Sequence, residues 1–432
     1  MTVGLALDLG VAAAAVLGRA DGIDDGPRAV AVIGRDPRSS GPFLEAAVVA
    51  GLASAGVDVL RLGVIPTPGV AYLTKALGAD FGVVISASHN PARDNGIKFF
   101  GRGGVKLPDA IEDEIEELTA AVPQRRTFFG RVTESSGEQE RYVDHLLATL
   151  PTEPRLPLAG LRVVVDCAHG AAYLVAPRAL RRAGAEVITI GAEPDGVNIN
   201  EGCGSTCLEA LGQAVLTYGA DAGIAYDGDA DRCLAVDADG QPLDGDQILT
   251  VLAAELKESG RLARDAVVVT VMSNEGFRVA MREAGIEVIE TPVGDKHVSA
   301  AMRDGGYVLG GEQSGHIILL EHASTGDGVL TSLQFLAAVN RRGVSVAAAA
   351  AMMRRYPQVL LNVPGDASQL GPRVDAAVSA AQSRLAGKGR VLVRPSGTEP
   401  TIRLMVQAED AGVAELVIGQ LADEVRLALA GQ

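Results

Sequence analysis

The chain has 432 residues, which suggests about three domains at the usual ~150 residues per domain. Its 38 basic and 54 acidic side chains give a net charge of −16, the wrong sign for a protein that binds nucleic acid or an anionic membrane, so an anionic ligand must be held by locally clustered cations. With 8 Phe, 7 Tyr and no Trp, the chain also has too few aromatic rings for the stacking platforms that bind single-stranded nucleic acid.

The cysteine content and the apolar segments indicate a cytoplasmic location. Four cysteines are too few to cross-link a chain of this length, and none has the paired Cys-x-x-Cys spacing of structural zinc. Residues 1–17 are apolar but contain Asp8 and no basic segment, and the apolar run 344–353 is too short to cross a bilayer. We therefore expect a reducing environment, with neither a signal peptide nor a transmembrane span.

Short β-branched runs alternate with Ala/Leu-rich amphipathic stretches along the chain, which is typical of βαβ units in mostly parallel or mixed sheets. The fold class is therefore α/β, and ligand sites are expected at the carboxyl ends of the strands. The predicted strands are 30–33, 83–85, 163–165, 223–226, 267–271 and 307–309.

These strands recur as couples, and in each couple the loop after the second strand is the more polar one. We interpret the couples as three related α/β units in tandem, although an α/β protein without repeats also produces such couples. Three prolines at 151–157 indicate a linker, and the stretches 245–260 and 357–364 mark two further junctions. The remaining tail predicts a helix at 374–385, a strand at 391–393 and a terminal helix.

The loop after the strand 83–85 reads Ser-Ala-Ser-His-Asn-Pro. A serine at the end of a buried strand, with His89 beside it and Lys98 ten residues further on, suits a nucleophile that is repeatedly acylated or phosphorylated. An ordinary polar turn is the alternative. No Gly-x-Ser-x-Gly elbow is present, which disfavours an α/β-hydrolase.

Three carboxylates stand at alternate positions directly after the strand 223–226, at Asp227, Asp229 and Asp231. They offer hard oxygen ligands to one Mg²⁺, and an EF-hand is disfavoured because its twelfth position here is Ala238. We favour a metal site over a solvated turn because so much charge stands at the mouth of a buried strand. Arg232 beside the metal suits a phosphate ligand.

Two further loops carry polar groups between glycines. Residues 310–316 combine a carboxylate, an amide, a hydroxyl and an imidazole, an inventory suited to sugar hydroxyls and proton transfer, although a Gly-rich turn explains this string equally well. Residues 394–400, with Arg403, combine backbone amides, two hydroxyls and two guanidinium groups, which predicts a phosphate cradle on a mobile tail unit. A β-turn without function is the alternative for this segment.

Four such loops in this order are more specific than any one of them, and the sequence resembles the α-D-phosphohexomutase family over nearly its whole length. The likeness rests on residues 85–91, 310–316 and 325–328, and Gln313 favours the members that act on glucosamine phosphate. The resemblance implies interconversion of glucosamine 6-phosphate and glucosamine 1-phosphate on the route to UDP-N-acetylglucosamine. A mutase of glucose or mannose phosphates, and a non-catalytic sugar-phosphate-binding protein, are the alternatives.

The resemblance also implies residue roles. Ser88 would be the phosphoserine and would hold one Mg²⁺ together with Asp227, Asp229 and Asp231, and a hexosamine 1,6-bisphosphate would be the intermediate and activator. The implied catalytic residues are Ser88, His89, Lys98, Arg35 and His316, with Lys98 and His316 as proton carriers. The implied substrate-binding residues are Arg232, Lys296, Glu312, Ser314, Arg394, Ser396, Gly397, Thr398 and Arg403.

The family fold implies three tandem related α/β domains with mixed sheets and a small C-terminal α+β domain, in a heart-shaped arrangement. We place these domains at 1–151, 152–246, 247–360 and 361–432. The partner is a small sugar phosphate rather than nucleic acid or membrane, and the oligomeric state stays open, with a homodimer as one option.

Two departures from the family pattern bear on the predicted activity. Family members begin with a strand that carries Phe-Gly-Thr-Asp-Gly-x-Arg-Gly, whereas this chain starts in the first predicted helix, so we expect that strand to be missing through a displaced start or a truncation. Lys296 and His297 stand where an Arg-Tyr pair is usual, which makes the sugar preference less secure.

Overall fold

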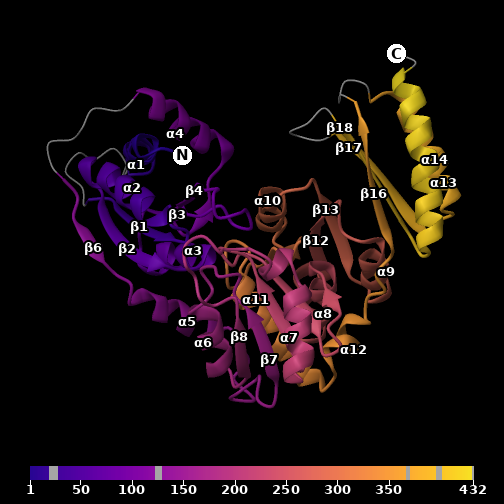
Figure 1. Cartoon of the computed structure of the whole chain (residues 1–432), viewed down its shortest axis with the longest axis horizontal. Coiled ribbons are helices and arrows are strands. Elements are labelled where there is room, and N and C mark those ends of the chain that lie inside the picture. Colours follow the sequence, from indigo (N-terminus) through magenta and orange to yellow (C-terminus); the bar gives the residue numbers. More distant parts are fainter. Residues whose placement is uncertain (19–27, 122–128, 366–369, 396–400, 431–432) are drawn as a thin grey trace. The chain divides into compact units, whose positions relative to one another are not determined.

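The computed structural model describes residues 1–18, 28–121, 129–365, 370–395 and 401–430 (Figure 1). The chain forms two compact units: residues 1–271 and 287–351 make up the larger one, and residues 272–286 and 352–432 the smaller one. Among the described residues, no helix has the length and hydropathy that crossing a membrane requires.

The larger unit contains three sheets that share one strand arrangement. In each, a central strand pairs in parallel with a strand on either side, and one of these neighbours pairs with an antiparallel strand. The strand orders are β5-β4-β3-β1-β2-β6, β11-β10-β9-β7-β8 and β13-β12-β14-β15. The strands are β1 (Val30–Arg35), β2 (Asp58–Val64), β3 (Phe81–Ile85), β4 (Ile97–Gly101), β5 (Val105–Lys106), β6 (Val132–Glu134), β7 (Arg162–Asp166), β8 (Glu186–Ile190), β9 (Ala222–Tyr226), β10 (Cys233–Asp237), β11 (Pro242–Leu243), β12 (Ala266–Thr270), β13 (Glu287–Thr291), β14 (Leu309–Gly311) and β15 (Ile317–Leu319).

The predicted couples are confirmed, because β1 pairs with β3, β7 with β9 and β12 with β14. One strand was misplaced: β14 begins at Leu309, so Tyr307 and Val308 lie before it. The three loops for which chemistry was predicted join β3 to β4, β9 to β10 and β14 to β15. They are therefore the same connection, repeated once in each sheet.

The stretch 245–260, at which we placed a junction, contains α8. A capping box starts α8, because Asp244 accepts from the backbone N–H of Gln247 while the Gln247 side chain bonds the backbone of Asp244. The helices of the larger unit are α1 (Val3–Leu17), α2 (Gly41–Ser54), α3 (Thr67–Ala76), α4 (Asp109–Ala121), α5 (Glu138–Ala148), α6 (Val175–Arg182), α7 (Glu209–Tyr218), α8 (Gly245–Glu258), α10 (Asp295–Gly305), α11 (Gly328–Arg342) and α12 (Val346–Ala350), with 3₁₀ turns at Gly204–Thr206 and Ala263–Asp265.

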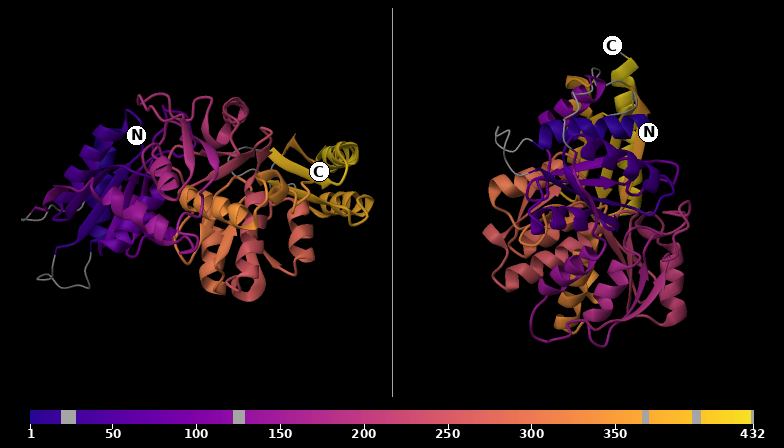
Figure 2. Two further views of the ribbon diagram at one scale, coloured as in Figure 1. Left: turned by 90° about the horizontal axis from the view of Figure 1, so that it is seen from below. Right: turned by 90° about the vertical axis from the view of Figure 1, so that its left-hand side faces the viewer.

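The smaller unit is an α+β unit, as predicted. Its antiparallel sheet has the order β16-β18-β17, formed by β16 (Gln358–Pro364), β17 (Gly389–Pro395) and β18 (Thr401–Ala408). Its helices are α9 (Glu275–Glu283), α13 (Pro372–Arg384) and α14 (Ala411–Ala430), of which α13 and α14 lie against the sheet (Figures 1 and 2). The boundary that we placed between residues 360 and 361 falls within β16.

Alternate residues of this sheet face opposite ways, as the two-residue period of a strand requires. On β18, Ile402, Leu404 and Val406 pack into the core with the helices. Their neighbours Arg403 and Met405 line a separate cavity of about 240 Å³. The sheet therefore has an apolar face under the helices and a face that presents arginine.

Helices α1 and α2 pack closely because glycines meet where they cross. A Cβ atom added to Gly51 would lie 2.2 Å from the carbonyl oxygen of Leu7 and 3.1 Å from the Cα atom of Gly10. Since both near atoms belong to the backbone, neither can move without shifting a whole helix.

We expect Gly51→Ala to lower the free energy of unfolding by about 1–3 kcal/mol through overpacking, although alanine is the better helix former. Urea denaturation would measure the change. Gly4→Ala is the matched control in α1, because its added Cβ meets nothing within 4 Å. Equal stability of the two variants would contradict the close helix contact.

Candidate active site

The β3–β4 loop brings Ser88 to the acidic loop after β9. The Ser88 hydroxyl donates to Oδ2 of Asp227 at 2.5 Å, and the backbone N–H of Ser88 donates to the Ser86 hydroxyl at 2.9 Å. Ser88 has a φ of 50°, which is uncommon for a residue with a Cβ atom. The backbone is thus held in an unfavourable conformation at the residue predicted to be the nucleophile.

A buried ion pair that the sequence analysis missed holds this loop in place. Arg38 pairs with Asp36, and both are 1% exposed. The other end of the Arg38 guanidinium donates to the carbonyl oxygens of Ser88 at 3.0 Å and Asn90 at 2.5 Å. Burial raises the pKa of Asp36 in spite of Arg38, so the pair carries a desolvation cost.

We expected Arg35 at this place, from the same Gly-Arg-Asp segment. The structure instead pairs Arg35 with Glu45 at 3.0 Å, and Glu45 also binds Arg61 at 3.0 Å. Arg38 contacts the Ser88 loop although it lies only three residues further on. The sequence signal that could have identified Arg38 is an arginine that stands two residues after an aspartate, Asp36, at the end of β1.

The predicted metal ligands converge. One oxygen from each of Asp227, Asp229 and Asp231 lies within 4.8 Å of the others, and the three residues are 0%, 1% and 7% exposed. Ala230 has a φ of 58°, which curls the loop between them. Oδ1 of Asp229 and Oδ1 of Asp231 are buried and have no hydrogen-bond partner among the described residues. Buried carboxylate oxygens without partners fit a divalent cation.

The pKa shifts within the triad also favour a cation at this site. Burial raises the pKa of Asp227 well above its usual value, and the charges of Asp231 and Asp229 raise it further. Burial acts in the same direction on Asp231, but its pKa is lowered because His316 and Lys98 outweigh burial. The site therefore needs positive charge in order to keep three carboxylates ionised.

Lys98 of β4 supplies part of this charge. The Lys98 ammonium lies 2.8 Å from Oδ2 of Asp229 and 3.9 Å from Oδ2 of Asp231, and Thr67 Oγ1 donates to the same Asp229 oxygen at 2.6 Å. Burial lowers the pKa of Lys98, but Asp229 and Asp231 outweigh it and raise the pKa above its usual value. Lys98 is thus a cation at the edge of the triad.

The β14–β15 loop joins the acidic loop through its backbone, since Arg232 and His316 form an isolated β-bridge. Nδ1 of His316 lies 3.7 Å from Oδ2 of Asp231, and Nε2 accepts from the backbone N–H of Gly326 at 3.1 Å. The neutral imidazole therefore carries its proton on Nδ1, which faces the triad.

His89 directly follows Ser88 and is exposed. Partial burial and then the charge of Arg232 lower the pKa of His89. Of the predicted catalytic residues, Ser88, Lys98 and His316 touch the triad, while Arg35 has Glu45 as its partner.

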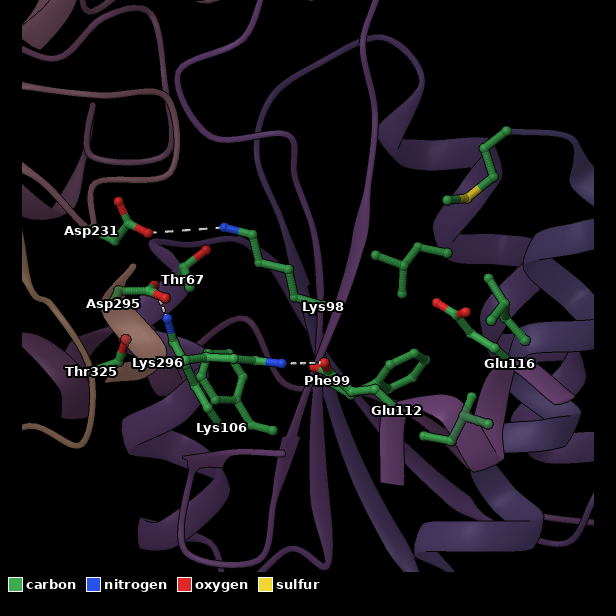
Figure 3. Close-up of a pocket in the computed structure, with 15 residues that line it drawn as sticks. Thr67, Lys98, Phe99, Lys106, Glu112, Glu116, Asp231, Asp295, Lys296 and Thr325 are labelled. Atoms are coloured by element: carbon green, nitrogen blue, oxygen red, sulfur yellow. Dashed lines mark hydrogen bonds and ion pairs between the residues drawn. The ribbon is translucent and has the colours of Figure 1, made fainter. Parts of the chain in front are cut away.

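A cavity of about 490 Å³ opens beside the triad (Figure 3). Asp231, Thr67 and Asp295 stand on one side of it, and Glu116 lies across from them. Lys106 forms an ion pair with Asp295. Lys296, expected to bind substrate, pairs with Asp109 and Glu112 of α4.

The polar residues of the loop predicted to bind sugar differ in their hydrogen bonds. Oε1 of Glu312 accepts from the backbone N–H of Gly294 at 3.3 Å, and Gln313 donates to Oδ2 of Asp244 at 3.1 Å. Gln313 thus ties its loop to the cap of α8. Ser314 Oγ is buried without a hydrogen-bond partner in the part of the chain that the structure describes, so its hydrogen-bonding capacity is unused.

The smaller unit places two predicted phosphate ligands opposite each other. Arg394 on β17 faces Arg403 on β18 in the antiparallel ladder, and both line the cavity of about 240 Å³ with Asn362. Burial, and then the charge of Arg403, lowers the pKa of Arg394. Like charges directly opposite are unfavourable, which an anion would relieve. Ser396, Gly397 and Thr398 lie outside the described residues.

Asp327 connects the β14–β15 region to α5. Its Oδ1 accepts from the backbone N–H of Leu330 at 2.9 Å, which caps α11, and its Oδ2 accepts from the Tyr142 hydroxyl at 2.8 Å. Asp327 is 2% exposed, and burial raises its pKa to about 6 in spite of these hydrogen bonds.

Sequence profiles of the phosphoglucomutase/phosphomannomutase family match the chain in four consecutive parts. Its alpha/beta/alpha domains I, II and III match residues 1–126, 140–240 and 244–356, and its C-terminal domain matches residues 345–424. The phosphoglucosamine mutase of Thermobifida fusca is 61% identical over 431 residues, which cover 99% of this chain and 95% of that protein.

Two solved structures have the same fold. A phosphoglucomutase/phosphomannomutase family protein from Burkholderia thailandensis superposes with a TM-score of 0.81 at 24% identity and covers 99% of this chain and 94% of its own. The N-acetylphosphoglucosamine mutase of Aspergillus fumigatus, solved with GlcNAc-6P and magnesium, gives a TM-score of 0.63 at 19% identity over 84% of this chain and 92% of its own. These matches confirm the predicted four-domain α/β fold.

The raised pKa of Asp327 predicts a specific pH dependence of stability. Its folded pKa of about 6 exceeds the usual 3.8, so the folded state binds the proton more tightly, and stability should fall as the pH rises from about 4 to about 6. Asp327→Asn keeps the helix cap and removes this fall, with a gain of up to about 3 kcal/mol above pH 6.

Urea denaturation of both proteins across this pH range, in EDTA, would measure the difference. Asp113→Asn, at an exposed position of α4, is the matched control and should follow the wild-type profile. A fall in the Asp327→Asn variant as large as that of the wild type would refute the assignment.

Proposed function

The chain belongs to the phosphoglucomutase/phosphomannomutase family and is an isomerase, and we propose that it interconverts glucosamine 6-phosphate and glucosamine 1-phosphate. The relatives named phosphoglucosamine mutase, 55–61% identical over nearly the whole chain, support this substrate. The observation that carries the proposed mechanism is the hydrogen bond of 2.5 Å between the Ser88 hydroxyl and the buried acidic triad.

The proposed reaction has two phosphoryl transfers. In the first, a sugar hydroxyl attacks the phosphorus of phospho-Ser88, so that a bond to the sugar oxygen forms as the bond to Ser88 Oγ breaks and the hydroxyl loses its proton. The resulting glucosamine 1,6-bisphosphate turns within the site, and Ser88 takes the other phosphate back. The bisphosphate is thus both the intermediate and the activator of an enzyme whose Ser88 is not phosphorylated.

The residues of the triad are proposed to hold one Mg²⁺ together with Ser88, and this ion supplies positive charge to the transferring phosphoryl group. Arg232 adds fixed positive charge beside the triad, and Lys98 and His316, which lie next to Asp229 and Asp231, are the proposed proton carriers. His89, beside Ser88, and Arg35, which pairs with Glu45, complete the proposed catalytic set.

We propose that sugar hydroxyls bind Glu312 and Ser314, and that Lys296 leaves its partners on α4 to bind a substrate oxygen. The phosphate that is not reacting is proposed to bind the cradle of the C-terminal domain, formed by Arg394, Ser396, Gly397, Thr398 and Arg403. The free cysteines among the described residues fit the proposed cytoplasmic location.

Ser88→Ala should lower mutase turnover by at least about 1000-fold, because no other group would carry the phosphoryl group between the two steps. A coupled assay of glucosamine 6-phosphate formation would measure the loss. Mass spectrometry of the wild type incubated with the bisphosphate should find one added phosphate on the peptide that contains Ser88. Turnover by the variant would sink the phosphoserine mechanism.

The substrate is tested by comparing kcat/KM for the 1-phosphates of glucosamine, glucose and mannose. We expect glucosamine 1-phosphate to be preferred by at least about tenfold over each of the others, which corresponds to one charge-assisted contact. Preference for glucose or mannose phosphate would favour the alternative mutase activity. Binding of all three without turnover would favour a non-catalytic sugar-phosphate-binding protein.

A further inference from the structure

Asp295 is a carboxylate of the cavity beside the triad to which neither the proposed metal site nor the proposed hydroxyl contacts give a role. Asp295 is the first residue of α10 and follows Gly294, whose φ of 128° turns the chain sharply. The backbone N–H of Gly294 donates to Oε1 of Glu312 at 3.3 Å, so this turn is fixed to a proposed sugar-binding residue. The Asp295 side chain is 33% exposed and lines the cavity (Figure 3).

The position of Asp295 relative to the triad is set by one imidazole ring. Nδ1 of His316 lies 3.7 Å from Oδ2 of Asp231, and Nε2 of the same ring lies 3.8 Å from Oδ2 of Asp295. Asp295 is therefore one ring width away from the place where phosphoryl transfer is proposed. Lys106 binds the same Oδ2 atom, which leaves Oδ1 for a ligand in the cavity.

The other carboxylates of the cavity are committed elsewhere or lie further from the triad. Asp231 belongs to the triad, and Glu112 pairs with Lys296. Glu116 is exposed on α4, across the cavity from Asp231 (Figure 3). Asp295 is thus the carboxylate on the triad side of the cavity that a substrate cation can meet.

Glucosamine phosphate has one feature that glucose phosphate lacks, an ammonium group at C2 in place of a hydroxyl. C2 is bonded to C1, so when the oxygen on C1 reacts with the phosphoryl group the ammonium lies directly beside the reacting oxygen. It must then find its partner close to the triad. A carboxylate binds an ammonium through a charge-assisted hydrogen bond, whereas a neutral hydroxyl gains less from the same carboxylate.

We propose that Asp295 determines specificity by binding the 2-ammonium group of glucosamine phosphate. This inference rests on the proposed function, since it names the group that recognises the proposed substrate. Asp295 acts on the choice of sugar rather than on the transfer of the phosphoryl group.

The test is Asp295→Asn, which keeps the shape of the side chain and removes its charge. We expect kcat/KM for glucosamine 6-phosphate, whose C1 oxygen attacks phospho-Ser88, to fall by about ten- to hundredfold, mainly through KM. The inhibition constant of glucose 6-phosphate, measured as a competitive ligand, should change by less than about threefold. Weakening of both sugars by the same factor would overturn the proposal, because Asp295 would then only shape the pocket.

Two further variants distinguish recognition of the ammonium group from two other effects of Asp295→Asn. These effects are the loss of a negative charge and the loss of the ion pair with Lys106. Glu116→Gln removes one negative charge from the same cavity and should leave the ratio between the two sugars unchanged. Lys106→Met breaks the ion pair from its other end but keeps the carboxylate, so it should preserve or increase the preference for the amino sugar. A loss of preference in Lys106→Met as large as in Asp295→Asn would also overturn the proposal.

Failure of the proposed function would look different. In that case the wild-type protein itself would show no preference for glucosamine 6-phosphate over glucose 6-phosphate. A wild-type preference that survives in Asp295→Asn would leave the proposed function intact and reject only the role of Asp295.

Discussion

Three carboxylates packed into one buried loop set the conditions for the rest of the active site. Asp227, Asp229 and Asp231 repel one another and lose their hydration, and both effects favour neutral acids. The larger unit offsets this cost with the charges of Lys98, from its first sheet, and of Arg232 in the loop itself. Nδ1 of His316, from its third sheet, also faces Asp231. These groups leave two buried carboxylate oxygens without partners among the described residues, which is the remaining need that a divalent cation meets.

The repeated sheet topology explains how groups so far apart in the chain reach one triad. Each of the three sheets ends its second parallel strand at the same kind of loop, which then returns as an antiparallel strand. The first such loop supplies Ser88, the second the carboxylates, and the third His316. One structural unit, used three times, thus provides a nucleophile, a metal site and a sugar site, and each loop could change its residues without altering its sheet.

Much of the fold and of the active site was predictable from the sequence. The reactive residues of each loop are close together in the sequence and directly follow a recognisable strand. What the sequence did not reveal are the contacts that cross from one segment to another. Arg38 was passed over for Arg35, since only the fold shows which of them faces the carbonyl of Ser88, 50 residues later. The ion pair of Lys106 with Asp295 joins residues 189 positions apart, so no local sequence pattern predicts it. The sequence pattern was enough to predict which strands form couples. The bounds of β14 were not predictable in this way, because they depend on pairing with β12 and β15.

The net charge of −16 does not predict the charge of the ligand, because acidic side chains form ion pairs with cations close to them. On α4, Asp109 and Glu112 hold Lys296, and in the cavity Asp295 holds Lys106. The two proposed phosphate-binding positions also differ in the charges that surround them. At the triad, clustered carboxylates demand a cation before a phosphate can approach, whereas Arg394 and Arg403 face each other across a ladder and favour an anion directly. A bisphosphate intermediate needs both kinds of position, one where the phosphate reacts and one where it is only held.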